Sequence, residues 1–92
     1  MERLNVQDGR RRFQALPAAV GHLHLPAGTV LPETRHPEDE VSFIHSGSLR
    51  AFSGGREYLL GAGDVTYIPA GEAHHAVVLE DVTLSYVLLE RP

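Results

Sequence analysis

Two stretches decide the fold of this chain: GTVLPETRHPEDEVSFIHSG at residues 28–47 and GDVTYIPAGEAH at residues 63–74. Each opens with a glycine and combines a short β-rich run with turn residues. The first contains His36 and Glu40, and the second ends with His74 at the start of a strand. Histidine nitrogens and carboxylate oxygens are common metal ligands and proton carriers. These three residues therefore form the only constellation in the sequence that carries chemistry.

The backbone around the first stretch is expected to be extended. Thr34 and His36 are two residues apart, so their side chains share one face of an extended segment. Pro37 favours that conformation at His36. Glu40 then opens an apolar strand, on the face that it shares with Ser42.

The two stretches resemble the paired motifs of the cupin superfamily, the small β-barrels that include germins. The first motif reads Gly, five residues, His-x-His, three or four residues, Glu, six residues, Gly, and the sequence matches it at Gly28, His36, Glu40 and Gly47. The second reads Gly, five residues, Pro-x-Gly, two residues, His, three residues, Asn, and the sequence matches it at Gly63, Pro69, Gly71 and His74. The sequence departs from the motifs at two positions. Thr34 stands where the first motif has its first histidine, and Val78 replaces the asparagine of the second.

The resemblance covers residues 28–78 and implies an all-β fold, a single jelly-roll-like β-barrel of the cupin type with little or no helix. The rest of the chain agrees, because short β-rich runs alternate with glycine and proline turns at near-regular spacing. Eight or nine short strands are expected, with breaks at Ser46-Gly47 and Glu80-Asp81. We divide this one domain into an N-terminal arm or edge strand at residues 1–18 and the barrel at residues 19–92.

Composition narrows the classes of partner. The 92 residues include no cysteine and no lysine, which excludes zinc sites built from thiolates and Schiff-base chemistry on lysine. A formal charge of −4 argues against nucleic acid and anionic membranes, since both favour a basic face. The first residues lack the apolar segment of a signal peptide, so a cytoplasmic location is expected. So small a core also favours association, and we expect a homodimer.

In metal-binding cupins the two motifs supply three histidines and a glutamate to one ion. The resemblance therefore assigns the role of metal ligand to His36, Glu40 and His74. Two imidazoles and one carboxylate suit iron, manganese, nickel or zinc, so the expected cofactor is a divalent transition metal. The alternative is a polar cluster kept by a barrel that no longer binds metal.

Thr34 and His24 are the candidates for an additional position at the metal or in the pocket. Thr34 is a poor ligand, and a water molecule is expected in its place. His24 faces the pocket only if Leu23 and Leu25 point outward, into a dimer interface. Otherwise His24 and its neighbour His22 are surface or interface residues, which is the more common role.

Arg50, Tyr67 and Tyr86 are the candidates for holding a polar substrate, although residues of this kind more often belong to an ordinary barrel surface. His45 and His75 are expected to point away from the three metal-ligand candidates, and no catalytic residue is assigned. The arginine run at residues 10–12 is interpreted as a solvated face.

The resemblance implies two functions of different classes. The first is an enzyme that uses its metal to act on a small oxygen-bearing metabolite, such as a sugar, a keto acid or a phenolic compound, by isomerase, lyase or dioxygenase chemistry. The second is a non-catalytic barrel that binds a metal or a small ligand as a sensor. The departures at Thr34 and Val78 favour the second, because metal-binding cupins usually keep those residues.

Overall fold

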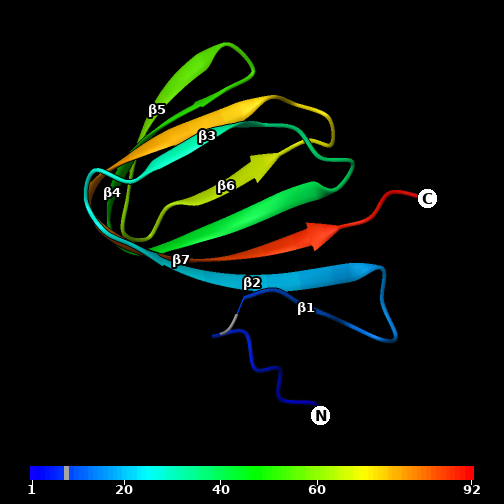
Figure 1. Ribbon diagram of the computed structural model, residues 1–92. Helices are drawn as coiled ribbons and strands as arrows, with labels where there is room; N and C mark the ends of the chain where they lie inside the picture. Colours follow the sequence, from blue (N-terminus) through cyan, green and yellow to red (C-terminus); the bar gives the residue numbers. More distant parts are fainter. Residues whose placement is uncertain (8) are drawn as a thin grey trace.

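The structure is a computed structural model that describes residues 1–7 and 9–92. Those residues contain strands and no helix, so no helix in the described part of the chain could cross a membrane (Figure 1). The strands are β1 (Arg11–Arg12), β2 (Ala18–Leu25), β3 (Val30–Thr34), β4 (Asp39–Ser53), β5 (Arg56–Gly61), β6 (Val65–Ile68) and β7 (His74–Leu89). All pairings between them are antiparallel, and the expected all-β fold is confirmed.

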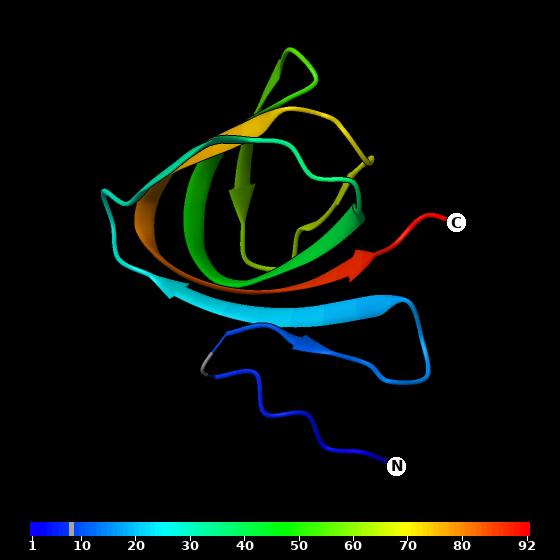
Figure 2. The ribbon, with the colours of Figure 1, turned by 45° about the vertical axis from the view of Figure 1, so that its right-hand side comes forward.

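The barrel is built around two long strands, β4 and β7, which curve around its interior (Figure 2). The first half of β4 pairs with β6 and with the second half of β7, and β2 lies on the other side of that half of β7. We call this group sheet I. The second half of β4 pairs with β5 and with the first half of β7, which also pairs with β3. We call this group sheet II.

The expectation of eight or nine strands is wrong, because two expected breaks are bends inside continuous strands. The pairing of β4 with β7 shifts register at several points between Ile44 and Leu49. Gly47 lies at this bend with a φ of 81°. A Cβ there would fall 1.9 Å from the carbonyl oxygen of Asp81, so only glycine lets the two bent strands approach so closely. Ser46-Gly47 and Glu80-Asp81 therefore carry each strand from one sheet into the other.

Strand β3 includes a proline, Pro32, and continues to Thr34. Proline lacks a backbone N–H, which excludes it from most strands. It is tolerated here because β3 pairs with β7 alone, and because the register shifts between Leu31 and Thr34. The irregularity brings Thr34 opposite His74.

The hydrophobic core lies where the two sheets face each other. Alternate residues of β4 and β7 point inward, and Val78 and Val82 are almost fully buried. The core cluster consists of Ile44, Leu49, Ala76, Val78, Val82 and Leu84. Val78, which replaces the asparagine of the cupin motif, is therefore a core residue.

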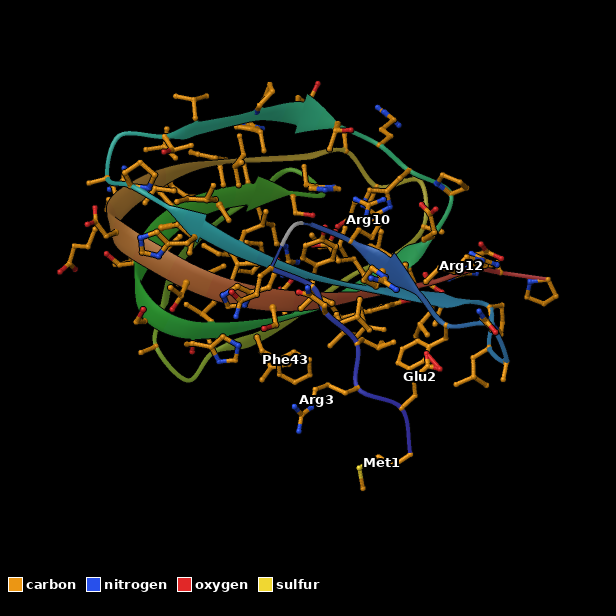
Figure 3. All side chains as sticks on the ribbon, turned by 60° about the horizontal axis from the view of Figure 1, so that its bottom comes forward. Met1, Glu2, Arg3, Arg10, Arg12 and Phe43 are labelled. Atoms are coloured by element: carbon orange, nitrogen blue, oxygen red, sulfur yellow. The ribbon has the colours of Figure 1, made fainter. Side chains whose placement is uncertain are left out.

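The N-terminal arm joins sheet I at its edge. Arg11 pairs with Val20 and Arg12 with Ala19, so β1 extends the sheet by one short strand beyond β2. The Arg12 guanidinium also forms an ion pair with Glu90. Its hydrogen bonds hold the pKa of the Glu90 carboxyl below its usual range. Figure 3 shows Met1 and Arg3 projecting away from the barrel.

Candidate metal centre

His36, Glu40 and His74 lie together at one end of the barrel. Glu40 is the second residue of β4, His74 is the first residue of β7, and His36 lies in the connection between β3 and β4. Each offers one nitrogen or oxygen atom, and these atoms all lie within 4.8 Å of one another. The two imidazole rings meet edge to face, with centroids 5.0 Å apart and planes at 74°. The structure therefore brings together the three residues that the motif resemblance assigns to a metal.

Backbone carbonyls orient both imidazole rings in the same way. His36 Nδ1 lies 3.0 Å from the carbonyl oxygen of Glu38, and His74 Nδ1 lies 3.0 Å from that of Glu72. A carbonyl oxygen only accepts hydrogen bonds, so Nδ1 of each ring carries the hydrogen and donates. The other ring nitrogen, Nε2, is then left to bind a ligand, an arrangement typical of metal-binding histidines.

Glu40 completes the donor set. Its Oε1 lies 3.2 Å from His36 Nε2, and its Oε2 accepts a 2.9 Å hydrogen bond from the Ser42 hydroxyl. In the neutral tautomer just described, His36 Nε2 carries a lone pair that faces a carboxylate oxygen, which is repulsive unless a cation lies between them. That cation is either a proton on His36 or a metal ion. Two imidazoles and a carboxylate are a chemically suitable donor set for a divalent transition metal.

The donor set lines a cavity of about 570 Å³ that lies between the two sheets. The side chains of His36 and Glu40 are 21% and 19% exposed, so the set is largely shielded from solvent. Most of the surrounding wall is apolar, and its larger aliphatic members are Leu23, Leu31, Ile44, Leu49, Leu60, Ile68 and Leu84. A volume of this size suits a small molecule.

Of the three candidate substrate-binding residues, only Tyr86 lines the cavity. Arg50 is on the outer surface, where it forms an ion pair with Glu57 at 3.2 Å. Tyr67 is 59% exposed and donates a hydrogen bond to the Asp39 carboxylate. The outward orientation of Arg50 and of Tyr67 follows from strand alternation, because their neighbours Ala51 and Thr66 face the cavity.

Thr34 and His24, the candidates for an additional position, lie on opposite sides of the barrel wall. Thr34 lines the cavity beside His74. His24 is exposed on the outer face, while Leu23 lines the cavity and Leu25 packs against the core. The alternative in which His24 replaces the missing ligand therefore does not hold, because the leucines fill the interior.

The remaining histidines lie outside the donor set. His22 and His45 stack on the outer face with ring centroids 6.3 Å apart, and Ser85 lies between them. His75, which was expected to point away from His74, lies at the rim of the same cavity. It is held there because its ring stacks on Phe52, with centroids 4.5 Å apart.

Sequence reasoning missed Arg10, which lines the cavity together with Tyr86. The interpretation of residues 10–12 as a solvated face is confirmed, because all three arginines are exposed. No motif signals that Arg10 also lines the cavity. The position of Arg10 depends on the pairing of β1 with β2, and the register of that pairing cannot be predicted from the sequence.

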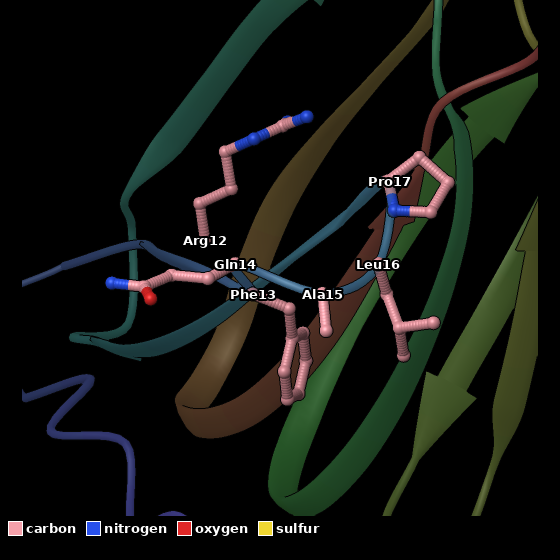
Figure 4. Close-up of a pocket in the computed structure, with 6 residues that line it drawn as sticks. All are labelled: Arg12, Phe13, Gln14, Ala15, Leu16 and Pro17. Carbon is pink, nitrogen blue, oxygen red and sulfur yellow. The ribbon is translucent and has the colours of Figure 1, made fainter.

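A second hollow, of about 490 Å³, lies on the turn between β1 and β2 (Figure 4). It is lined by residues 12–17 alone. Phe13, Ala15 and Leu16 extend to one side of the turn and Arg12 to the other. The hollow lacks a set of convergent polar groups, and the donor set described above lies elsewhere.

Fold, motif and donor set together define the class of protein. The cupin domain family model matches residues 21–90. The chain belongs to the cupin family.

The chain is also similar to individual proteins of several organisms. It is 39% identical over 56 residues to an uncharacterised protein of Streptomyces coelicolor, a match that covers 61% of this chain and 53% of that protein. The chain thus spans about half the length of this curated relative. Among solved structures, the cupin domain of Cnp3 from Schizosaccharomyces pombe is similar, with a TM-score of 0.82 and 18% identity over 89% of this chain and 62% of that one. The oxalate decarboxylase of Bacillus subtilis, a protein with Mn(II) centres, has a TM-score of 0.74 and 26% identity over 83% of this chain and 22% of that one.

Proposed function

We propose that this cupin is an enzyme that uses a divalent transition metal, held by His36, Glu40 and His74, to act on a small oxygen-bearing metabolite. The observation that carries the proposal is the pair formed by His36 Nε2 and Glu40 Oε1, which face each other at 3.2 Å inside an apolar cavity. A carboxylate in such surroundings is costly unless a cation accompanies it. The likeness to a Bacillus enzyme with Mn(II) centres supports the same conclusion.

The chain's own residues have separate tasks in this proposal. His36 and His74 present Nε2, because their Nδ1 atoms are bound to backbone carbonyls. Ser42 holds the Glu40 carboxylate in place by donating to Oε2. The apolar walls limit access of water to the substrate. When bound, the metal supplies Lewis acidity toward substrate oxygens, which suits isomerase, lyase or dioxygenase chemistry on sugars, keto acids or phenolic compounds.

A non-catalytic ligand-binding barrel is the second candidate, and Thr34 favours it. Thr34 lies beside His74 where metal-binding cupins usually have a further histidine. Fewer protein ligands weaken the hold on a metal. A binding module would take up ligand saturably and release no product.

Elemental analysis of protein purified without chelator tests the proposal. We expect a stoichiometric transition metal in the wild type and in the control His45→Ala, whose histidine lies outside the barrel. We expect loss of the metal in His36→Ala and in His74→Ala. Unchanged metal content in both of these variants would show that the proposed site is wrong. If the metal is lost as expected, screening of the metal-loaded wild type for product distinguishes enzyme from binding module.

We also infer that the chain forms a homodimer through the outer face of sheet I. Phe43, Val65 and Tyr67 are 39%, 60% and 59% exposed there. Phe43 pairs with Val65 across β4 and β6, so these side chains form one continuous surface. Clustered exposed apolar side chains are typical of protein interfaces.

A further inference from the structure

Arg10, an exposed residue, contributes to the lining of the cavity a cation that the metal centre does not use. Arg10, from the N-terminal arm, lies over the ring of Tyr86 with its guanidinium carbon 5.5 Å from the ring centroid. Its Nε donates a long hydrogen bond, 3.4 Å, to the Tyr86 hydroxyl. Both residues line the cavity that contains His36, Glu40 and His74.

The arm holds Arg10 in this place through its neighbours. Arg11 pairs with Val20 in the sheet, and Arg12 forms two hydrogen bonds with the Glu90 carboxylate. These contacts fix the backbone directly beside Arg10. The Arg10 side chain thereby reaches the cavity that Tyr86 also lines.

Gly21 fixes the position of Tyr86 from the other side. The two residues are partners across β2 and β7. A Cβ at residue 21 would fall 2.0 Å from Cζ of the Tyr86 ring and 2.3 Å from its hydroxyl oxygen. The ring therefore rests directly on the β2 backbone, where only glycine leaves room for it. Tyr86 is thus held between the backbone of Gly21 and the guanidinium of Arg10.

The charges of the cavity favour an anionic ligand. Among the described residues that line it, Glu40 is the only carboxylate and Arg10 the only arginine. With a divalent ion beside Glu40 the lining is net positive, and the Glu38 carboxylate, which lies 3.6 Å from His36 Nδ1 and is not part of the lining, offsets only part of that charge. A neutral sugar would need many polar partners, whereas most of the wall consists of apolar side chains.

We propose that Arg10 and Tyr86 form an anion-binding subsite that takes the carboxylate of the substrate. The guanidinium and the phenolic hydroxyl supply hydrogen-bond donors to the carboxylate, and charge-assisted bonds of this kind are strong. The apolar walls take a short hydrocarbon or aromatic body, and a second oxygen of the substrate faces the metal centre. This inference rests on the proposed function and narrows its substrates to small carboxylic acids with an apolar body.

Titration calorimetry with matched acids and amides tests the subsite. The probes are 4-hydroxybenzoate and 4-methyl-2-oxopentanoate, each compared with its neutral amide. We expect at least one acid to bind metal-loaded wild type about tenfold tighter than its amide, as for a charge-assisted hydrogen bond. We expect Arg10→Gln to remove that preference without changing the metal content. The control Arg11→Gln, on the opposite side of the arm, should keep it.

Two further variants test the geometry. Tyr86→Phe removes one donor and should reduce the preference for the acid in part. Gly21→Ala displaces the Tyr86 ring and should reduce the preference for the acid as Arg10→Gln does. Circular dichroism checks that each variant is folded. Binding of neither acid, or a preference that survives Arg10→Gln, would overturn the subsite.

Titration of chelator-treated protein separates this inference from the proposed function. An acid preference that depends on Arg10 in the absence of metal supports the subsite even if the elemental analysis finds no metal. A stoichiometric metal without any Arg10-dependent preference supports the metal centre and overturns the subsite.

Discussion

Each metal-ligand candidate is oriented by a neighbour two residues away in the chain. The Nδ1 atoms of His36 and His74 donate to the carbonyls of Glu38 and Glu72, and Ser42 donates to the Glu40 carboxylate. Such local contacts keep the donor atoms aimed at one point, which reduces the rearrangement needed on metal binding. The weak point of the set is position 34, where a threonine occupies the cavity wall beside His74.

Thr34→His is expected to tighten metal binding. A third imidazole beside His74 would replace a water molecule, and we expect the affinity for Mn²⁺ or Ni²⁺ to rise by about tenfold. Titration calorimetry of the apo-protein measures this change. Val30→His is the control, because Val30 is on the same strand and 63% exposed. Equal affinity in Thr34→His and the wild type would mean that residue 34 does not face the ion.

At the level of elements, the bends in β4 and β7 turn one set of strands into a closed barrel. Each strand serves sheet I with one half and sheet II with the other. This geometry requires close contact between Gly47 and the backbone of Asp81. Because Glu40 is the second residue of β4 and His74 is the first of β7, the same bends determine how the metal-ligand candidates meet.

Gly47→Ala is expected to destabilise the protein severely. The new Cβ would collide with the carbonyl of Asp81, which belongs to backbone and cannot rotate away. We expect a loss of about 3 kcal/mol or more in the free energy of unfolding, measured by urea denaturation. Gly55→Ala is the matched control. Its φ of 78° is similar, but nothing lies within 4 Å of the added Cβ, so a loss of only about 1 kcal/mol is expected. Equal losses in both variants would contradict the close contact.

Strand segments and turns could be predicted from the sequence, but the continuity of the long strands could not. Ser46-Gly47 has the composition of a turn, and nothing local distinguishes a turn from a bulge that is held by a strand distant in sequence. The three metal-ligand candidates could be identified from the spacing of residues in the two motifs. Arg10 was missed, because its position depends on pairing between β1 and β2 and on an ion pair between residues 12 and 90.

At the level of the whole molecule, two ion pairs fasten residues 90 and 91 to the rest of the barrel. Arg12 binds Glu90, and Arg91 binds Asp39 at 2.9 Å. The Asp39 carboxylate also accepts hydrogen bonds from the Ala70 N–H and the Tyr67 hydroxyl. It thereby joins β4 to the connection after β6 and to the residues that follow β7.

Acid is expected to weaken this junction. Hydrogen bonds from Arg91 and from the Ala70 N–H lower the pKa of Asp39 in the folded protein. The stabilisation is therefore present above about pH 4, the range of an unfolded aspartate, and is lost as the pH falls through the folded pKa. We expect Asp39→Asn to lower the Tm at pH 7, with a difference from wild type that shrinks as the pH falls through the lowered pKa of Asp39.

Arg91→Gln is the companion variant, because it removes the main cause of the lowered pKa of Asp39. It should show the same pH dependence as Asp39→Asn in thermal melts followed by circular dichroism. A Tm difference that stays constant from neutral to acidic pH would contradict the role assigned to this carboxylate.

Self-association is expected to depend on the outer face of sheet I. Phe43→Glu places a charge in the centre of the exposed apolar surface and should shift the protein toward monomer in sedimentation velocity. Leu59→Glu is the control, since Leu59 is 71% exposed on β5, outside this surface. A wild type that sediments as a monomer, or equal behaviour of both variants, would argue against this interface.

The central place of β7 has a consequence for biosynthesis. β7 follows the other six strands in the chain, yet β2, β3 and β4 all pair with it. During translation, the local pairings of β4 with β5 and β6 can form first, while the edges of β2 and β3 that later pair with β7 remain unpaired. Closure of the barrel is therefore a late event that follows the emergence of residues 74–89 from the ribosome. Nascent chains that stall before that point expose unpaired strands, which are a substrate for chaperones and a starting point for aggregation.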